Sequence, residues 1–182
     1  MASSYARWIG HWERRLASRD KERTIRPFEW GLEWLEAEGF DGDPRRYVRD
    51  YTRRAAACSQ EFFSYRSPSD FVFDGHTLRF TSPLVSPYPE NNRVHADLFP
   101  AKRAGNRAVV VLPQWNADAS GHAALCRLLT RFGLTALRMS LAYHDRRMPA
   151  GLQRADYHVS SSVGRTIHAS RQSVIDARAC VD

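Results

Sequence analysis

The hydrophobic pattern of the chain changes near residue 67. Before this position, apolar residues recur at intervals of three and four, which is typical of amphipathic helices. After it, apolar residues alternate with polar ones or form short continuous runs, which is typical of strands. Helical spacing returns near residue 120 and again from Val163. The pattern predicts an α/β protein with a helical amino-terminal extension over 1–66 and a sheet that begins within 67–182.

Three helices are predicted in the extension. The first has one apolar face, formed by Tyr5, Trp8, Ile9, Trp12 and Leu16. This face either packs on the rest of the domain or lies on a membrane surface, and we favour packing as the usual role of such a helix. The second helix runs from Pro27 and stops at Gly39. The third begins with Asp43 as N-cap and Pro44 at its first position, and extends to about Phe63.

The middle of the chain predicts strands. Asp74-Gly75 lies between two alternating apolar segments, which indicates a β-hairpin. A further strand covers 94–98, where His95 and Asp97 share one face. Two residues of this kind can form a metal or catalytic pair, but most such pairs are ordinary surface residues. We favour the surface interpretation.

The next segment predicts a β-α-β unit. Residues 108–112 form a continuous apolar run that is typical of a strand buried on both faces. A helix follows, with Ser120 as expected N-cap and Gly133 as C-cap. Its expected buried face consists of Leu125, Leu128, Leu129 and Phe132. A second buried strand covers 134–141, so a right-handed parallel crossover is expected.

Function is expected at the carboxyl ends of these two strands, where open α/β sheets bind ligands. One loop there contains Gln114, Trp115 and Asn116, and the other begins at Tyr143 and His144. The first loop leads into a helix amino terminus, where unpaired N–H groups favour a developing negative charge. In α/β-hydrolases, a backbone N–H of such a loop is one half of the oxyanion hole.

A long amphipathic helix closes the sequence. Ser162 is its expected N-cap, and its expected apolar face is Val163, Ile167, Ser170, Val174, Ala177 and Val181. A helix that follows a parallel strand normally returns the chain to another strand of the sheet. We therefore expect the sequence to be the first part of a longer domain.

Charge and cysteine content narrow the function classes. The chain has 27 Lys and Arg residues against 20 Asp and Glu, a formal net charge of +7. Because the arginines are spread along the chain and not gathered in blocks, we expect a solvated basic surface and no nucleic-acid partner. Three separated cysteines without C-x-x-C spacing are typical of a reducing compartment. No apolar run approaches the ~20 residues of a membrane span, and no secretory leader is recognised. A cytoplasmic protein without a transmembrane segment is expected.

Three segments resemble a known family: LPQWNADASGHAALCRLL, LRMSLAYHDRRMP and RADYHVSSSVGRTIHASRQSVIDARAC. They are similar to the first half of a bacterial α/β-hydrolase family of esterase-type enzymes. FEWGLEWL and SPYPENNRVHADLFPA are similar to its amino-terminal extension and first strands, so the resemblance covers Pro27 to the end. In that family the long helix leads into a strand and a G-x-S-x-G nucleophile elbow, with the acid and the histidine later still. None of these segments occurs in residues 1–182.

The resemblance implies an incomplete α/β-hydrolase fold, a single partial domain over 1–182, and a set of site residues. Trp115 is the expected oxyanion-hole donor, with Gln114 and Asn116 as the off-by-one alternatives. Near the pocket mouth the resemblance places Tyr143, His144, Asp145 and Arg147. No catalytic residue is assigned, because the triad is absent. His122, His158 and His168 have no metal-ligand spacing with His144, so no metal or cofactor is expected.

The expected function is therefore the amino-terminal part of a hydrolase that acts on an ester or similar acyl bond of a small molecule in its full-length form. Alone, the chain is expected to be inactive and to self-associate through exposed strand edges. Two alternatives stay open. One is a non-enzymatic remnant or binding protein with the same fold. The other is a basic surface binder of nucleic acid or anionic membrane.

Overall fold

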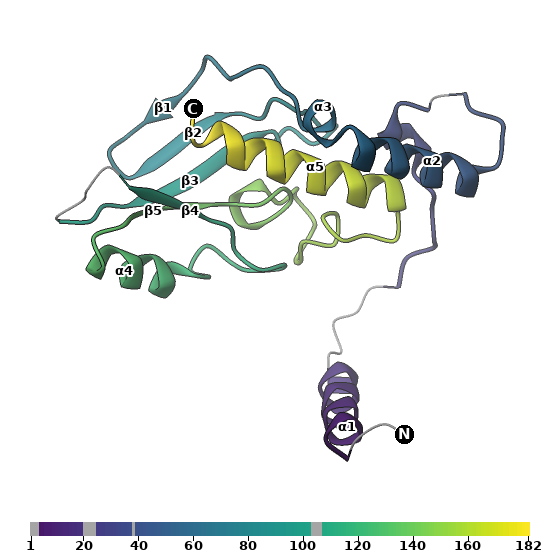
Figure 1. The fold of residues 1–182 in the computed structure, drawn as a ribbon, viewed down its shortest axis with the longest axis horizontal. Coiled ribbons are helices and arrows are strands. Elements are labelled where there is room, and N and C mark those ends of the chain that lie inside the picture. The colour runs from purple at the N-terminus through teal and green to yellow at the C-terminus, as the bar shows by residue number, and fades with distance from the viewer. Residues whose placement is uncertain (1–3, 20–24, 38, 103–106) are drawn as a thin grey trace.

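A computed structural model describes residues 4–19, 25–37, 39–102 and 107–182. Figure 1 shows its centre, an open mixed sheet of five strands in the order β1-β2-β3-β5-β4. The strands are β1 (Val72–Phe73), β2 (Thr77–Thr81), β3 (Arg93–Phe99), β4 (Ala108–Val111) and β5 (Thr135–Met139). The α-helices within the described ranges are α1 (Ser4–Arg19), α2 (Pro44–Ala57), α3 (Ser59–Phe62), α4 (Ala123–Arg131) and α5 (Val163–Ala179). Two 3-10 turns are η1 (Leu32–Leu35) and η2 (Asp145–Arg147).

Sheet pairing confirms the predicted α/β class, the hairpin and the parallel pairing of the two strands of the β-α-β unit. β1 and β2 pair antiparallel around Asp74-Gly75, with Phe73 opposite Leu78. β4 and β5 pair parallel and are joined through α4. Helices cover both faces of the sheet. Residues of β5 that point to opposite faces pack against different helices. Ala136 packs with Cys126 of α4, whereas Met139 packs with Ala179 of α5.

Several predicted helix boundaries are confirmed by capping contacts. The Asp43 side chain accepts a hydrogen bond from the Arg45 N–H at 3.0 Å, and α2 begins at Pro44. The Ser162 side chain accepts from the Arg165 N–H at the start of α5. After α4, Gly133 adopts a left-handed φ of 74°, as a C-terminal glycine should.

Other boundaries are wrong for local reasons. The helix expected over 27–39 shrinks to η1, because Gly31 and Glu36 adopt left-handed conformations on either side of it. The helix expected to reach Phe63 is interrupted at Cys58. The N-cap of α4 is His122 and not Ser120, whose hydroxyl donates to the Asp118 carboxylate at 2.7 Å.

The expected apolar faces of α4 and α5 are wrong in part, although Leu129 and Ala177 do pack on the core, and the expected face of α1 is exposed. In α4, Cys126 and Leu129 pack on the sheet, while Leu125, Leu128 and Phe132 are exposed. In α5, Val174 and Val181 are exposed, and the buried face includes Gln172, Ser173 and Asp176. In α1, large apolar side chains point to solvent: Tyr5, Trp8, Trp12 and Leu16. The packing interpretation of α1 is therefore contradicted, and the buried face of α5 combines Ala169, Ile175 and Ala179 with these polar residues.

The segment before η1 is attached to the amino terminus of α5. The Glu29 N–H donates to the Ser161 carbonyl at 3.0 Å, and the Val163 N–H donates back to the Glu29 carbonyl at 3.1 Å. The Gly164 N–H donates to the Trp30 carbonyl at 2.9 Å. A Cβ added at Gly164 would lie 1.9 Å from the Gly31 carbonyl oxygen, so only glycine allows this approach.

We expect Gly164→Ala to lower the free energy of unfolding by about 1–3 kcal/mol, because the added methyl group must push two backbone segments apart. Urea unfolding followed by circular dichroism measures the change. Ser170→Ala, at an exposed position of the same helix, should change stability by less than about 0.5 kcal/mol. Equal stability of the two variants would contradict the close approach.

None of the described helices is both long enough and apolar enough to cross a membrane. The three cysteines are free thiols, with Cys126 buried and Cys58 exposed.

Candidate functional site at the ends of two parallel strands

The loops that follow β4 and β5 meet in the structure. The backbone N–H of Asn116 donates to Nε2 of His144 at 2.9 Å. A third segment joins them, because the Asn116 side-chain oxygen accepts from the Ala155 N–H at 2.9 Å. The indole N–H of Trp115 donates to the Ala155 carbonyl at 3.2 Å. The structure thus brings the two predicted loops together and adds residues near 155.

His144 holds this arrangement as a neutral imidazole. Its Nε2 accepts a hydrogen bond, so its proton sits on Nδ1, which lies 2.8 Å from the Ala142 carbonyl oxygen. Burial lowers the pKa of His144, with a further lowering by the Arg147 charge. Both ring nitrogens of His144 are occupied, so it orders the loop and offers no free nitrogen as a base.

His158 lies beside His144, which sequence reasoning did not predict. The two ring centres are 5.0 Å apart, and Nδ1 of His158 lies 3.0 Å from the same Ala142 carbonyl oxygen. Burial and then the neighbouring His144 lower the pKa of His158 to about 4. The pair is therefore uncharged at neutral pH, which avoids two like charges in a buried space.

Asp145 does not contact His144 as a catalytic acid would. Its carboxylate accepts from Nη1 of Arg138 at 3.1 Å and from the Ser140 hydroxyl at 2.7 Å. Burial raises the pKa of Asp145, but the hydrogen bonds from Ser140 and Arg138 outweigh it and keep the pKa below its ordinary value.

Arg138 connects the same two loops from the interior of the protein. It is fully buried and also donates to the backbone carbonyls of Gly121, at 2.7 Å, and Asp118. One guanidinium therefore links the loop after β4 to Asp145 of the loop after β5. The sequence signal for Arg138 is a charged residue inside the apolar run 134–141, and hydrophobic periodicity does not register it.

Tyr143 and Arg147 are buried beneath the two loops. The Tyr143 N–H donates to the Asn91 side-chain oxygen at 2.8 Å, and its ring contacts Tyr88 and Tyr157. Burial raises the pKa of Tyr143 to about 12. Arg147 is fully buried and forms an ion pair with Asp176 at 2.8 Å. Neither side chain is available to a ligand at the surface, so both act as structural supports of the loops.

The three candidate oxyanion-hole donors differ in whether their backbone N–H already makes a hydrogen bond. The Asn116 N–H is occupied by His144. Over the described ranges, the backbone N–H groups of Gln114 and Trp115 have no hydrogen-bond partner. Non-glycine residues with left-handed φ angles also gather at this edge: Asn116 at 58°, His122 at 66°, Tyr143 at 62° and Asp145 at 47°. Backbone strain of this kind clusters at functional sites.

A nucleophile with its base is missing from the part of the chain that the structure describes. There, no serine or cysteine side chain is hydrogen-bonded to a histidine. The hydroxyl of Ser162 caps α5, and that of Ser160 donates to the Ser162 carbonyl. Asp97 is paired with Arg146 at 2.8 Å and not with His95. The described residues also contain no group of three or more side chains that is able to hold a metal ion.

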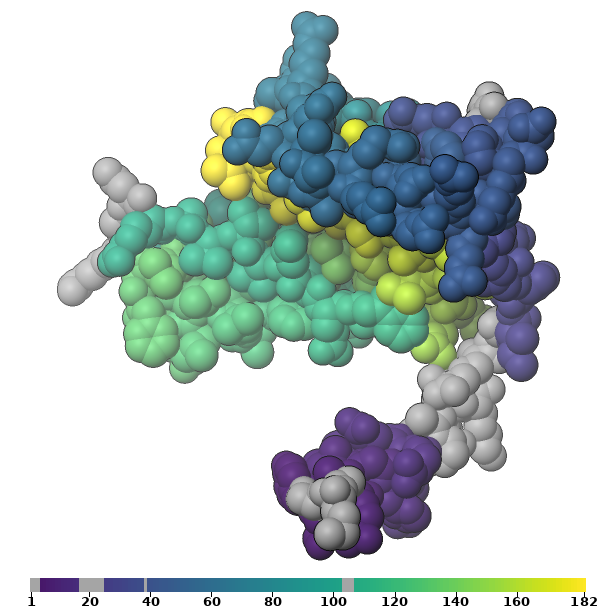
Figure 2. Space-filling view, turned by 45° about the vertical axis from the view of Figure 1, so that its right-hand side comes forward, coloured from purple at the N-terminus to yellow at the C-terminus, as the bar shows by residue number. Residues whose placement is uncertain are grey.

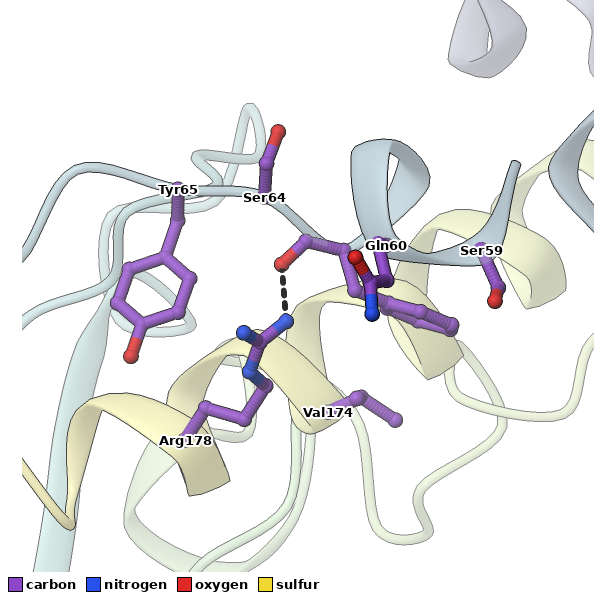
Figure 3. Close-up of a pocket in the computed structure, with 7 residues that line it drawn as sticks. Ser59, Gln60, Ser64, Tyr65, Val174 and Arg178 are labelled. Carbon is purple, nitrogen blue, oxygen red and sulfur yellow. Dashed lines mark hydrogen bonds between the residues drawn. The ribbon is translucent and has the colours of Figure 1, made fainter.

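A hollow in another part of the structure is a second candidate site. It is a groove with a volume of about 610 Å³. Figure 3 shows that it lies between α3 and α5 and that Arg178 projects into it from α5. Its guanidinium donates to the Phe63 carbonyl at 2.7 Å. The residues that line it do not include any member of the loops after β4 and β5. The groove provides no reactive pair, so the loops are the better candidate site.

No family model matches the sequence, and no curated protein matches it either. Fold and site together define a mixed α/β protein with an open sheet and a buried polar network beneath two loops.

Proposed function

We propose that this chain is the amino-terminal part of an α/β-hydrolase that acts on an ester or similar acyl bond. In this proposal, the loop after β4 supplies the oxyanion-hole donor, and the serine nucleophile belongs to a segment other than residues 1–182. The loops after β4 and β5 form part of the substrate pocket, with Trp115 at its mouth.

The proposal rests on the position of the loop after β4 and on the hydrogen bonds of its backbone N–H groups. It connects a parallel strand to a helix, as the oxyanion loop of α/β-hydrolases does. His144 takes the Asn116 N–H and fixes the loop, which leaves the Trp115 N–H as the donor to a developing oxyanion. The resemblance of the sequence favours the same residue. Gln114 is the alternative, because its N–H is equally unengaged.

The open edge of the sheet agrees with this proposal. β4 is an edge strand, and apolar side chains near it are exposed: Leu112, Leu125, Leu128 and Phe132. Exposed apolar surface of this extent is usually covered by another segment or another chain. A further part of the same fold would cover it in the complete enzyme.

The purified 182-residue chain should not hydrolyse an activated ester such as p-nitrophenyl acetate above the buffer rate. The physical reason is that its described residues pair no hydroxyl or thiol with a histidine. Measurement of p-nitrophenolate release at neutral pH tests this, with heat-treated protein as the control. Turnover that co-purifies with the chain and disappears in Ser162→Ala would contradict the proposal.

The decisive experiment reads and expresses the DNA that follows the codon for Asp182. The proposal expects a strand followed by G-x-S-x-G, and ester hydrolysis by the extended protein. In that protein, Trp115→Pro removes one backbone N–H and should lower kcat by about 10²–10³-fold. Trp115→Phe keeps the N–H and should retain kcat, and equal melting temperatures would exclude a folding effect. Absence of a nucleophile segment would favour the non-enzymatic binding protein.

A further inference from the structure

Helix α1 presents two chemically different faces. Its apolar side chains are largely exposed: Tyr5 at 71%, Trp8 at 62%, Trp12 at 50% and Leu16 at 42%. At roughly 100° per residue they fall within one arc, and Arg7 and Arg14 lie on the opposite side. Glu13 is the only acidic residue within Ser4–Arg19. We call the aromatic side the tryptophan face.

The rest of the described structure does not cover the tryptophan face. In Figures 1 and 2, α1 stands apart from the sheet and from the other helices. Among the described residues, the hydrophobic core clusters contain no member of α1. Exposed aromatic rings on one side of a helix cost free energy in water, and an exposed apolar patch of this kind marks an interaction site for another surface.

We propose that α1 docks on an anionic lipid bilayer, with the tryptophan face between the head groups and the acyl chains. Tryptophan and tyrosine rings favour this interface because they are apolar with one polar edge. Arg7 and Arg14 on the opposite side then remain among the head groups, where arginine is attracted to negative lipids. The helix lies in the plane of the membrane and does not cross it, because its 16 residues span only about 24 Å.

Charge and chemistry together select the lipid surface over other partners. A nucleic-acid site would use the arginines but would gain little from Trp8 and Trp12 on the other side of the helix. A second copy of the chain would bury the tryptophan face but would gain nothing from the basic side. Only an anionic bilayer uses both faces at once. This inference does not depend on the proposed hydrolase function.

The experiment measures co-sedimentation of the full chain with vesicles of phosphatidylcholine, with and without phosphatidylglycerol. Binding should require phosphatidylglycerol, shift tryptophan fluorescence to the blue and weaken with salt. Arg7→Gln with Arg14→Gln should weaken the partition coefficient at least about thirtyfold. Trp8→Ala with Trp12→Ala should weaken it by at least the same factor, because both rings leave the interface.

The matched control variants carry the same kinds of substitution, two Arg→Gln changes and an aromatic→Ala change, outside α1. Arg46→Gln with Arg53→Gln alters the net charge equally on α2, where both side chains are 75% exposed, and should retain most of the binding. Phe132→Ala removes a ring that is 72% exposed at the C-cap of α4, and this variant should also retain most of the binding.

Three results would overturn the inference. The first is equal loss of binding in the α1 and α2 charge variants. The second is retention on heparin that needs Arg7 and Arg14 but not Trp8 and Trp12, which would favour nucleic acid. The third is vesicle-free self-association that the tryptophan variant abolishes, which would show that a second copy covers this face.

Discussion

Arg147→Met should lower the free energy of unfolding by about 3–5 kcal/mol, the largest effect expected from any single substitution in this chain. Arg147 donates to the Asn91 carbonyl at 2.7 and 2.9 Å and to the Ser140 carbonyl at 3.0 Å. It also neutralises Asp176, whose side chain is fully buried. Methionine fills much of the same volume but removes the Arg147 donor from two carbonyls and from Oδ2 of Asp176, whose Oδ1 still accepts from the Ser82 hydroxyl. Urea unfolding at neutral pH measures the loss.

The neighbouring Arg146 provides the matched control. It forms an ion pair with Asp97 at 2.8 Å, but its side chain is 36% exposed. Water therefore replaces the lost partner, and Arg146→Met should cost no more than about 1 kcal/mol. The double variant Arg147→Met with Asp176→Leu should be more stable than Arg147→Met alone, because it also removes the uncompensated charge. Equal losses at the two arginines would contradict the buried network.

Lowering the pH from 6.5 to 4 should destabilise the protein by up to about 3 kcal/mol through His158 alone. Burial lowers the pKa of His158 from 6.5 to about 4 in the folded state. Between these two values the unfolded chain binds a proton that the folded protein does not, so acid favours unfolding and stability rises with pH. The pKa of His144 is shifted in the same direction by burial, so it adds to the effect.

The pH dependence is measured by urea unfolding at a series of pH values. His158→Asn retains a donor for the Ala142 carbonyl but does not titrate, so the curve of this variant should be flatter between pH 6.5 and 4. His76→Asn, at an exposed turn residue, is the matched control and should keep the wild-type profile. At lower pH, Asp145 acts in the same sense. Its pKa is lowered, so the stability that it contributes at neutral pH is lost as the pH falls. A wild-type profile in His158→Asn would contradict the buried imidazole.

Local chemistry made part of the fold predictable. Asp43 with Pro44, Ser162 and Gly133 act on groups only a few residues away, so their role depends little on distant contacts. The hairpin at Asp74-Gly75 is local in the same way. The parallel crossover was predictable because a strand, a helix and a strand in close succession allow few other arrangements.

Burial was predictable only where the core is apolar. The expected face of α5 was chosen from its aliphatic residues, but the helix packs its polar side on Arg147 and Asn91. Gln172 accepts from the Asn91 side chain at 2.7 Å, and Asp176 faces Arg147. The same buried face also contains Ile175 and Ala179, but an apolar pattern alone does not predict the polar residues between them. For α1 the error was the opposite one, since an apolar face was assumed to have a partner within the domain.

The sequence by itself determined most of the element types, their order and the two loops where chemistry is expected, since hydrophobic period, caps and turns act over short distances. Tertiary structure alone decided which atoms those loops use. It placed the Asn116 N–H on His144 and joined both loops through Arg138. It also directed the Asp145 carboxylate to Arg138 and not to the neighbouring His144. Most of these contacts link residues that are 20 or more positions apart in the sequence, and all of them depend on side-chain direction and burial, which periodicity does not encode.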